Sequence, residues 1–119
     1  MTEHLILLFL FITKHFIIDF ILQTERQVFT KGIWGHPVGF SHSFEHGIWT
    51  AVILVFYIKI ELALCLAFSE IFIHYVTDFC KMAFGEKNCQ KKRFWIQLGL
   101  DQYIHYLTYF YLIFIATNA

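Results

Sequence analysis

Four apolar segments of near-bilayer length divide the chain, and they constrain its fold more than any other feature. The segments cover residues 5–22, 37–58, 62–80 and 94–116. A transmembrane helix needs about 20 apolar residues, and a helix satisfies its own backbone hydrogen bonds in lipid. With 119 residues, the chain has room for one domain, residues 1–119. We predict an all-α, integral membrane four-helix bundle with antiparallel, up-down topology.

The overall composition supports a membrane protein and argues against nucleic acid as a partner. Hydrophobic residues make up 58% of the chain and charged residues only 15%, whereas soluble domains carry about 25% charged residues. The formal net charge is zero, so a basic surface for nucleic acid is not expected. We expect the lipid bilayer to be the main partner, and the sequence leaves the oligomeric state open.

Lysine and arginine are concentrated between the first and second segments and between the third and fourth. These connections carry Arg26, Lys31, Lys81, Lys87, Lys91, Lys92 and Arg93. Basic loops stay preferentially in the cytoplasm, which predicts a multi-pass protein of the cell inner (cytoplasmic) membrane with both termini outside. The first residues, MTEHL, contain no Lys or Arg, so we expect no cleaved signal peptide.

Ionisable residues interrupt all four segments in the half nearest the basic connections. Pairs four residues apart, which share a helix face, are His15 with Asp19, His74 with Asp78, and Asp101 with His105. At a helical rise of 1.5 Å per residue, the cluster lies about 5 to 18 Å below the basic loops. Charges inside a bilayer are costly, so such groups usually face a cavity and mark function.

Imidazole and carboxylate groups are the usual ligand set for Zn, Mn, Fe or Ni. We predict that one or two divalent transition metal ions bind to His15, Asp19, His46, His74, Asp78, Asp101 and His105. Two ions bridged by carboxylate are typical of phosphoryl hydrolases, but some carboxylates could instead orient the histidines. Lys81 could steady an anionic substrate or snorkel to the interface. Lys14 and Glu45 could pair with each other or with the site.

The order of motifs along the chain resembles a known family. The motifs are H-x3-D-F-x2-Q from His15, a histidine at His46, H-x3-D-x2-K from His74, and D-Q-x2-H from Asp101. This pattern resembles the small bacterial and phage membrane proteins described as domain of unknown function 3307. The resemblance implies an integral membrane protein and favours roles for Gln23, Lys81 and Gln102. We assign Lys81 and Gln102 to catalysis.

These patterns together predict a metal-dependent membrane hydrolase that acts on a lipid-linked or head-group substrate from the cytoplasmic side. One alternative is a channel or carrier for a cation or proton, which needs a polar path to the outer face. Another is an accessory membrane protein whose polar cluster is only structural. Binding of b-type haem by facing histidines is a further alternative, although it does not require the paired aspartates.

Overall fold

The computed structural model describes residues 2–119, so Met1 of the predicted domain lies outside the described range. The elements are α1 (Glu3–Phe16), the π-helical turn η1 (Ile17–Leu22), α2 (Glu25–Thr30), α3 (Pro37–Leu54), α4 (Ile60–Phe84) and α5 (Lys92–Asn118). Within residues 2–119 there is no β-strand. The predicted all-α class is therefore confirmed.

The ends of the long helices differ from the predicted segments by a few residues. α3 begins at Pro37 as expected but ends at Leu54, because the backbone N–H groups of Phe56 and Tyr57 bond to carbonyls three residues back and form a turn. α4 instead continues past the apolar segment to Phe84. Lys81 lies in this last turn, where a positive charge interacts favourably with the helix dipole.

The short helix α2 lies in a connection for which the sequence analysis predicted no helix. Thr24 and Gln27 form a reciprocal capping box: the Thr24 hydroxyl accepts from the Gln27 backbone N–H, and the Gln27 side chain accepts from the Thr24 backbone N–H. The T-x-x-Q spacing is a known helix-start signal. The signal is present in the sequence, but no long apolar run follows it.

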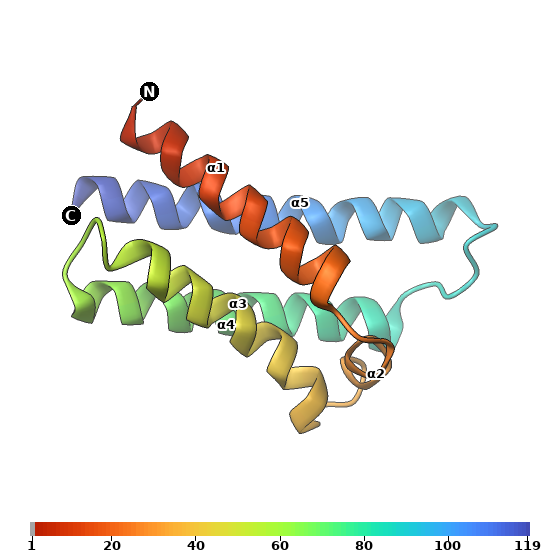
Figure 1. The fold of residues 1–119 in the computed structure, drawn as a ribbon. Helices are drawn as coiled ribbons and strands as arrows, with labels where there is room; N and C mark the ends of the chain where they lie inside the picture. Colours follow the sequence, from red (N-terminus) through yellow and green to blue (C-terminus); the bar gives the residue numbers. More distant parts are fainter. Residues whose placement is uncertain (1) are drawn as a thin grey trace.

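The long helices alternate in direction along the chain (Figure 1). Both termini lie at the same end of the molecule as the turn between α3 and α4, whereas α2 and the α4–α5 connection lie at the other end (Figure 1). α1 contacts α3 and α5, and α4 also contacts both α3 and α5. Each long helix therefore has two long neighbours around a shared interior.

That interior is apolar toward the end that carries the termini and polar toward the other end. The apolar core consists of Leu7, Phe11, Leu54, Ala63, Leu66, Tyr109, Leu112, Ile113 and Ala116. The buried histidines and carboxylates follow these residues along α1 and η1, and they precede Leu54 in α3 and Tyr109 in α5. The chain thus buries its polar groups together in one half of the molecule.

The exterior is unusually apolar, and two helical stretches are long and apolar enough to cross a membrane. These stretches are Glu3–Leu22 and Ile60–Phe84, and of the 18-residue apolar part of each only 28% and 33%, respectively, is buried within the molecule. The core helix of a soluble protein would be mostly buried. α3 and α5 are not among the two stretches, because α3 carries His42, Glu45 and His46, and α5 also contains several polar groups.

A close contact between α2 and α3 depends on Gly39, and Gly39→Ala is expected to destabilise the fold. A Cβ at this position would lie 2.5 Å from the Thr30 carbonyl oxygen, so the two helices must separate. The expected loss is about 1–3 kcal/mol of unfolding free energy, as for other overpacked sites. Thermal unfolding in detergent would measure it. The control is Gly99→Ala, whose Cβ meets nothing within 4 Å; equal stability of both variants would contradict the expectation.

Candidate metal site

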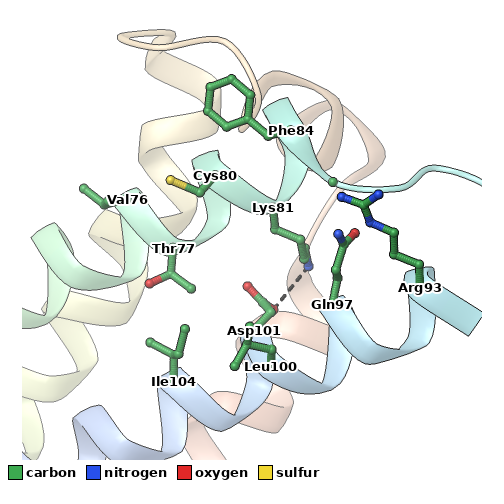
Figure 2. A pocket seen from close by; sticks show the side chains of 11 residues that line it. Val76, Thr77, Cys80, Lys81, Phe84, Arg93, Gln97, Leu100, Asp101 and Ile104 are labelled. Carbon is green, nitrogen blue, oxygen red and sulfur yellow. Dashed lines mark hydrogen bonds and ion pairs between the residues drawn. The ribbon is translucent and has the colours of Figure 1, made fainter.

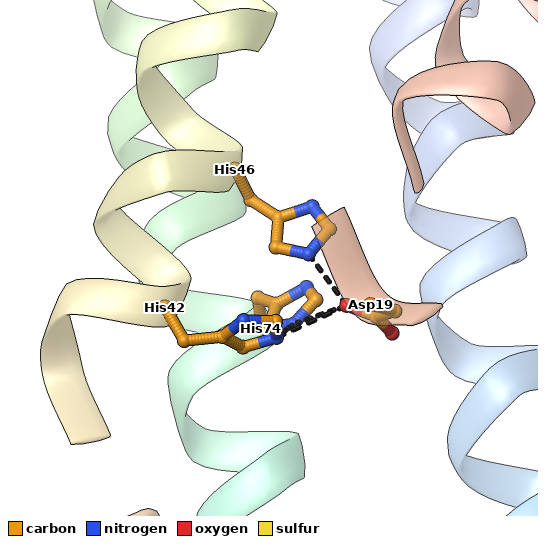
Figure 3. Close-up of side chains that lie close together, drawn as sticks. All are labelled: Asp19, His42, His46 and His74. Atoms are coloured by element: carbon orange, nitrogen blue, oxygen red, sulfur yellow. Dashed lines mark hydrogen bonds and ion pairs between the residues drawn. The ribbon is translucent and has the colours of Figure 1, made fainter. Parts of the chain in front are cut away.

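Two histidines one turn apart on α3 face a carboxylate from the first helical stretch. The Nε2 atoms of His46 and His42 lie 2.7 and 3.0 Å, respectively, from Asp19 Oδ1. From α4, His74 brings its Nε2 to 3.3 Å from the Nε2 of His42 and 4.0 Å from Asp19 Oδ1. Figure 3 shows the three imidazoles converging on the Asp19 side chain. Three separate helical segments therefore supply one group.

These four residues form the first of two groups that could hold a metal ion. Each offers one ligand atom, and the ligand atoms of Asp19, His42, His46 and His74 all lie within 4.8 Å of one another. The side chains of the three histidines are at most 1% exposed, and that of Asp19 is 9% exposed. The donor set is three imidazoles and one carboxylate, which suits a divalent transition metal.

The second group consists of His74, Asp78 and His105, and it joins α4 to α5. Asp78 Oδ2 lies 3.2 Å from His74 Nε2, and Asp78 Oδ1 lies 3.1 Å from His105 Nε2. Because His74 presents the same Nε2 atom to both groups, the groups are contiguous. Because one Nε2 lone pair can bind only one ion, His74 could serve either group but not both at once.

Asp19 occupies its position because the chain changes helix type immediately before it. α1 ends at Phe16, and residues 17–22 form the π-helical turn η1. A π-turn widens the helix locally and is frequent at functional sites. The Gln23 side-chain amide closes the turn by donating to the backbone carbonyl of Asp19 at 3.0 Å. Gln23, which the family resemblance favoured, therefore supports the backbone of Asp19.

His15, Asp101 and Gln102 lie at the edge of the two groups rather than within them. His15 Nε2 is 3.1 Å from Asp19 Oδ2 and 2.7 Å from the Gln102 side-chain oxygen. The Gln102 amide donates to Asp101 Oδ2 at 3.1 Å, and Asp101 Oδ1 lies 3.4 Å from His105 Nε2. The other ring nitrogen of His15, Nδ1, lies 2.7 Å from the Tyr109 hydroxyl, and this hydrogen bond fixes the orientation of the ring. This arrangement resembles the outer partners that orient metal ligands.

A buried ion pair, Lys14 with Glu70, lies on the side of the histidines that faces the apolar core. Lys14 Nζ is 2.5 Å from Glu70 Oε1 and donates to the Thr50 hydroxyl at 2.8 Å and to the His46 carbonyl at 3.1 Å. Thr50 in turn donates to Glu70. Glu70 Oε1 also lies 3.8 Å from His46 Nδ1. Lys14 therefore pairs with Glu70, and not with Glu45.

Two further lysines pair with carboxylates on the side of the basic connections. Lys31 Nζ, just after α2, lies 3.1 Å from Asp78 Oδ2, and Lys81 Nζ lies 3.2 Å from Asp101 Oδ2. The Lys31 side chain is 6% exposed and that of Lys81 is 23% exposed. Lys81 thus extends from the cluster toward the surface, which is the position expected for a group at the mouth of a site.

Buried polar atoms without good hydrogen bonds test whether the residues fit a metal ion. Asp78 Oδ2 and Asp101 Oδ1 are buried and accept no hydrogen bond from the described residues, although charged groups lie near both. In addition, the facing Nε2 atoms of His42 and His74 are both potential acceptors. A metal ion in the two groups would use such lone pairs of Asp78, His42 and His74, so the donor set fits a divalent metal.

The structure brings the sequence-predicted site residues into one connected cluster. His46, His74, Asp19, Asp78 and His105 belong to the two groups, and His15 and Asp101 contact them. Sequence reasoning left His42 out of the ligand set, although it stands one turn before His46 on the same helix face. That i, i+4 spacing was the available signal. The roles of Lys81 and Gln102 in catalysis stay predictions.

Comparison with known proteins adds a family but no activity. No curated protein and no solved structure matches the chain. A family model described as "Protein of unknown function (DUF3307)" matches residues 7–119, which is nearly the whole chain and includes every residue of the two groups. The chain therefore belongs to the DUF3307 family, as the order of its His and Asp motifs predicted.

Proposed function

We propose that this protein is an integral membrane, metal-dependent hydrolase that acts on a lipid-linked or head-group substrate. The metal site consists of the two His/Asp groups, with one or two divalent ions such as Zn, Mn, Fe or Ni. The observation that carries the proposal is the convergence of imidazole Nε2 atoms from α3, α4 and α5 on two aspartates in a buried interior.

The exposed surface supports placement in a bilayer. Large apolar side chains such as Phe9, Phe68, Phe72 and Phe114 are each between 64% and 70% exposed. Soluble monomers rarely expose such continuous apolar surface. We propose that α1 with η1, α3, α4 and α5 all cross the inner membrane as a four-helix bundle. The basic connections around α2 and residues 85–91 would lie in the cytoplasm, and both termini would lie outside.

The chemistry follows from the donor set and its surroundings. A bound divalent ion would supply an activated water and neutralise developing negative charge. Hydrolysis then joins the water oxygen to phosphorus, breaks the ester P–O bond and leaves a proton for the departing oxygen. Asp101 lies 3.4 Å from His105 and 3.2 Å from Lys81, so it links the metal groups to a cation at the mouth. Gln102 would position His15 and Asp101 through its amide.

The apolar core argues against a channel or carrier formed by a single chain. Leu7, Phe11, Leu54 and Leu112 are each 0% exposed, and they fill the interior between the polar cluster and the end with the termini. An ion that entered from the basic side would have to cross this packed apolar layer. A site reached from one face of the bilayer fits hydrolysis better than transport.

Metal content is the first test of this proposal. Protein purified without chelators is expected to contain one or two equivalents of a transition metal by elemental analysis. His74→Ala should lose most of this metal, because His74 belongs to both groups. His4→Ala is the matched control, since His4 is exposed and far along α1 from the cluster. Metal-free wild-type protein, or unchanged content in His74→Ala, would contradict the metal site.

Turnover is tested separately with lipid vesicles that contain phosphatidate and phosphatidylglycerol. Wild-type protein is expected to release phosphate or head group, as followed by mass spectrometry of the lipid products, and chelation should stop the release. His74→Ala should be inactive and His4→Ala fully active. Stoichiometric metal without any lipid product would leave the metal site in place but would contradict hydrolysis of these head groups.

A further inference from the structure

A groove between α4 and α5 opens directly beside the polar cluster. It has a volume of about 480 Å³ and reaches Lys81 and Asp101. Its remaining lining consists of Val76, Thr77, Cys80, Phe84 and Gly85 from the α4 side and Arg93, Gln97, Leu100 and Ile104 from α5. Figure 2 shows these side chains around the space, with the Lys81–Asp101 pair at its centre.

The end of the groove nearest the basic connection is cationic. Lys81 and Arg93 both line it, and Figure 2 shows Lys81 directed toward Asp101 and Arg93 directed toward the end of α4, with the Gln97 side chain between them. Within residues 2–119, Arg93 forms no ion pair. Gln97 holds this end in place, because its side-chain oxygen accepts from the backbone N–H of Glu86 at 2.7 Å. An arginine and a lysine that line one end of a groove suit a phosphate group.

The opposite end of the groove is mostly apolar, with Thr77 as its polar residue. α4 runs toward the basic connection and α5 runs away from it, so Val76 and Ile104 lie farther from that connection than Phe84 and Arg93 do. Leu100 on α5 lines the groove and is 54% exposed, so the groove is accessible from the outside of the molecule at this point. The groove therefore has a cationic end at the basic side and an apolar end toward the middle of the helices.

We propose that this groove binds an anionic phospholipid, with its phosphate between Arg93 and Lys81 and an acyl chain along Val76, Leu100 and Ile104. This inference deepens the proposed function and rests on it for the membrane setting. The polarity of the groove matches that of a lipid in the cytoplasmic leaflet, whose head group faces the basic side and whose chains point to the bilayer centre. The occupant is a phosphate monoester lipid such as phosphatidate.

The groove also explains how a substrate would reach the metal groups without entering the closed interior. Asp101 lines the groove and is only 3% exposed. Its carboxylate contacts His105, which in turn lies 3.1 Å from Asp78. A phosphate held by Lys81 would therefore sit next to the second group. Displacement of Lys81 from Asp101 toward the phosphate would free the Asp101 carboxylate to face the metal site.

Binding is tested with short-chain dihexanoyl phosphatidate on the full-length, metal-loaded protein in detergent. Microscale thermophoresis is expected to show saturable binding of phosphatidate, with phosphatidylcholine of the same chain length at least tenfold weaker. Glycerol 3-phosphate, which has the head group alone, should also bind at least tenfold more weakly. Arg93→Gln should weaken phosphatidate binding about tenfold, which corresponds to about 1.4 kcal/mol of binding free energy. Arg26→Gln, an exposed arginine outside the groove, is the matched control.

The outcomes separate this inference from the proposed function. Equal binding of phosphatidate and phosphatidylcholine, or an unaltered affinity in Arg93→Gln with metal content unchanged, would overturn the lipid groove and leave the metal site standing. Equal binding of glycerol 3-phosphate would assign the groove to free phosphate esters and overturn the lipid. Selective phosphatidate binding by a metal-free protein would support the groove while the hydrolase fails. Lys81→Gln gives a second variant if Arg93→Gln does not fold.

Discussion

Glu70→Ala is expected to lower the free energy of unfolding by about 3–5 kcal/mol, the usual cost of leaving a buried charge without its partner. Lys14 and Glu70 are 4% and 1% exposed in their side chains, and their charged atoms are 2.5 Å apart. Removal of the carboxylate leaves the Lys14 ammonium with only the Thr50 hydroxyl and one backbone carbonyl. Denaturant unfolding in detergent, followed by tryptophan fluorescence, would measure the loss.

The double variant Lys14→Met/Glu70→Met is the matched control for this effect. It removes both charges and keeps apolar volume, and such replacements of buried pairs are often neutral or stabilising. It should therefore recover most of the stability that Glu70→Ala loses. A double variant as unstable as Glu70→Ala would show that the cost arises from packing rather than from the unpaired charge.

His42→Ala is expected to weaken metal binding by more than about 100-fold, and His15→Ala by about 10–100-fold, the range for residues that orient ligands. The reason is geometric. His42 Nε2 lies 3.0 Å from Asp19 Oδ1 and belongs to the first group, whereas His15 contacts Asp19 through the other oxygen and is held by Gln102 and Tyr109. Competition with a coloured chelator would give both affinities.

The order of these two effects distinguishes the ligand set predicted from the sequence from the one that the structure favours. The ligand set predicted from the sequence contains His15 and lacks His42. A larger loss in His15→Ala than in His42→Ala would support the former set and contradict the latter. His4→Ala should bind metal like the wild type, which controls for the loss of a histidine as such.

The Glu70 variant and the histidine variants test different parts of the same polar cluster. Glu70 lies 3.8 Å from His46 Nδ1, so the Lys14–Glu70 pair supports the site from the side of the apolar core. Lys31 and Lys81 pair with Asp78 and Asp101 from the side of the basic connections. The His/Asp groups therefore lie between a buried ion pair on one side and two lysines on the other.

Much of the fold followed from local features of the sequence. Long apolar stretches predicted the positions of α1, α3, α4 and α5, because a helix is the structure that satisfies backbone groups within such a stretch. The His15–Asp19, His74–Asp78 and Asp101–His105 pairs predicted one polar face for three of the helices. Helix α2 was missed, since a six-residue helix depends on its caps and contacts rather than on a periodic pattern.

The sequence by itself determined that polar side chains line one half of a helical assembly, because spacing along a helix dictates which residues share a face. Only the tertiary structure decided which of these side chains meet. The packing of α3 against α4 brought His42 to within 3.3 Å of His74, and the π-turn at residues 17–22 placed Asp19 against His42 and His46. Packing also paired Lys14 with Glu70 rather than with Glu45. Contacts between helices depend on crossing and rotation, which are set by the shapes of all packed residues together.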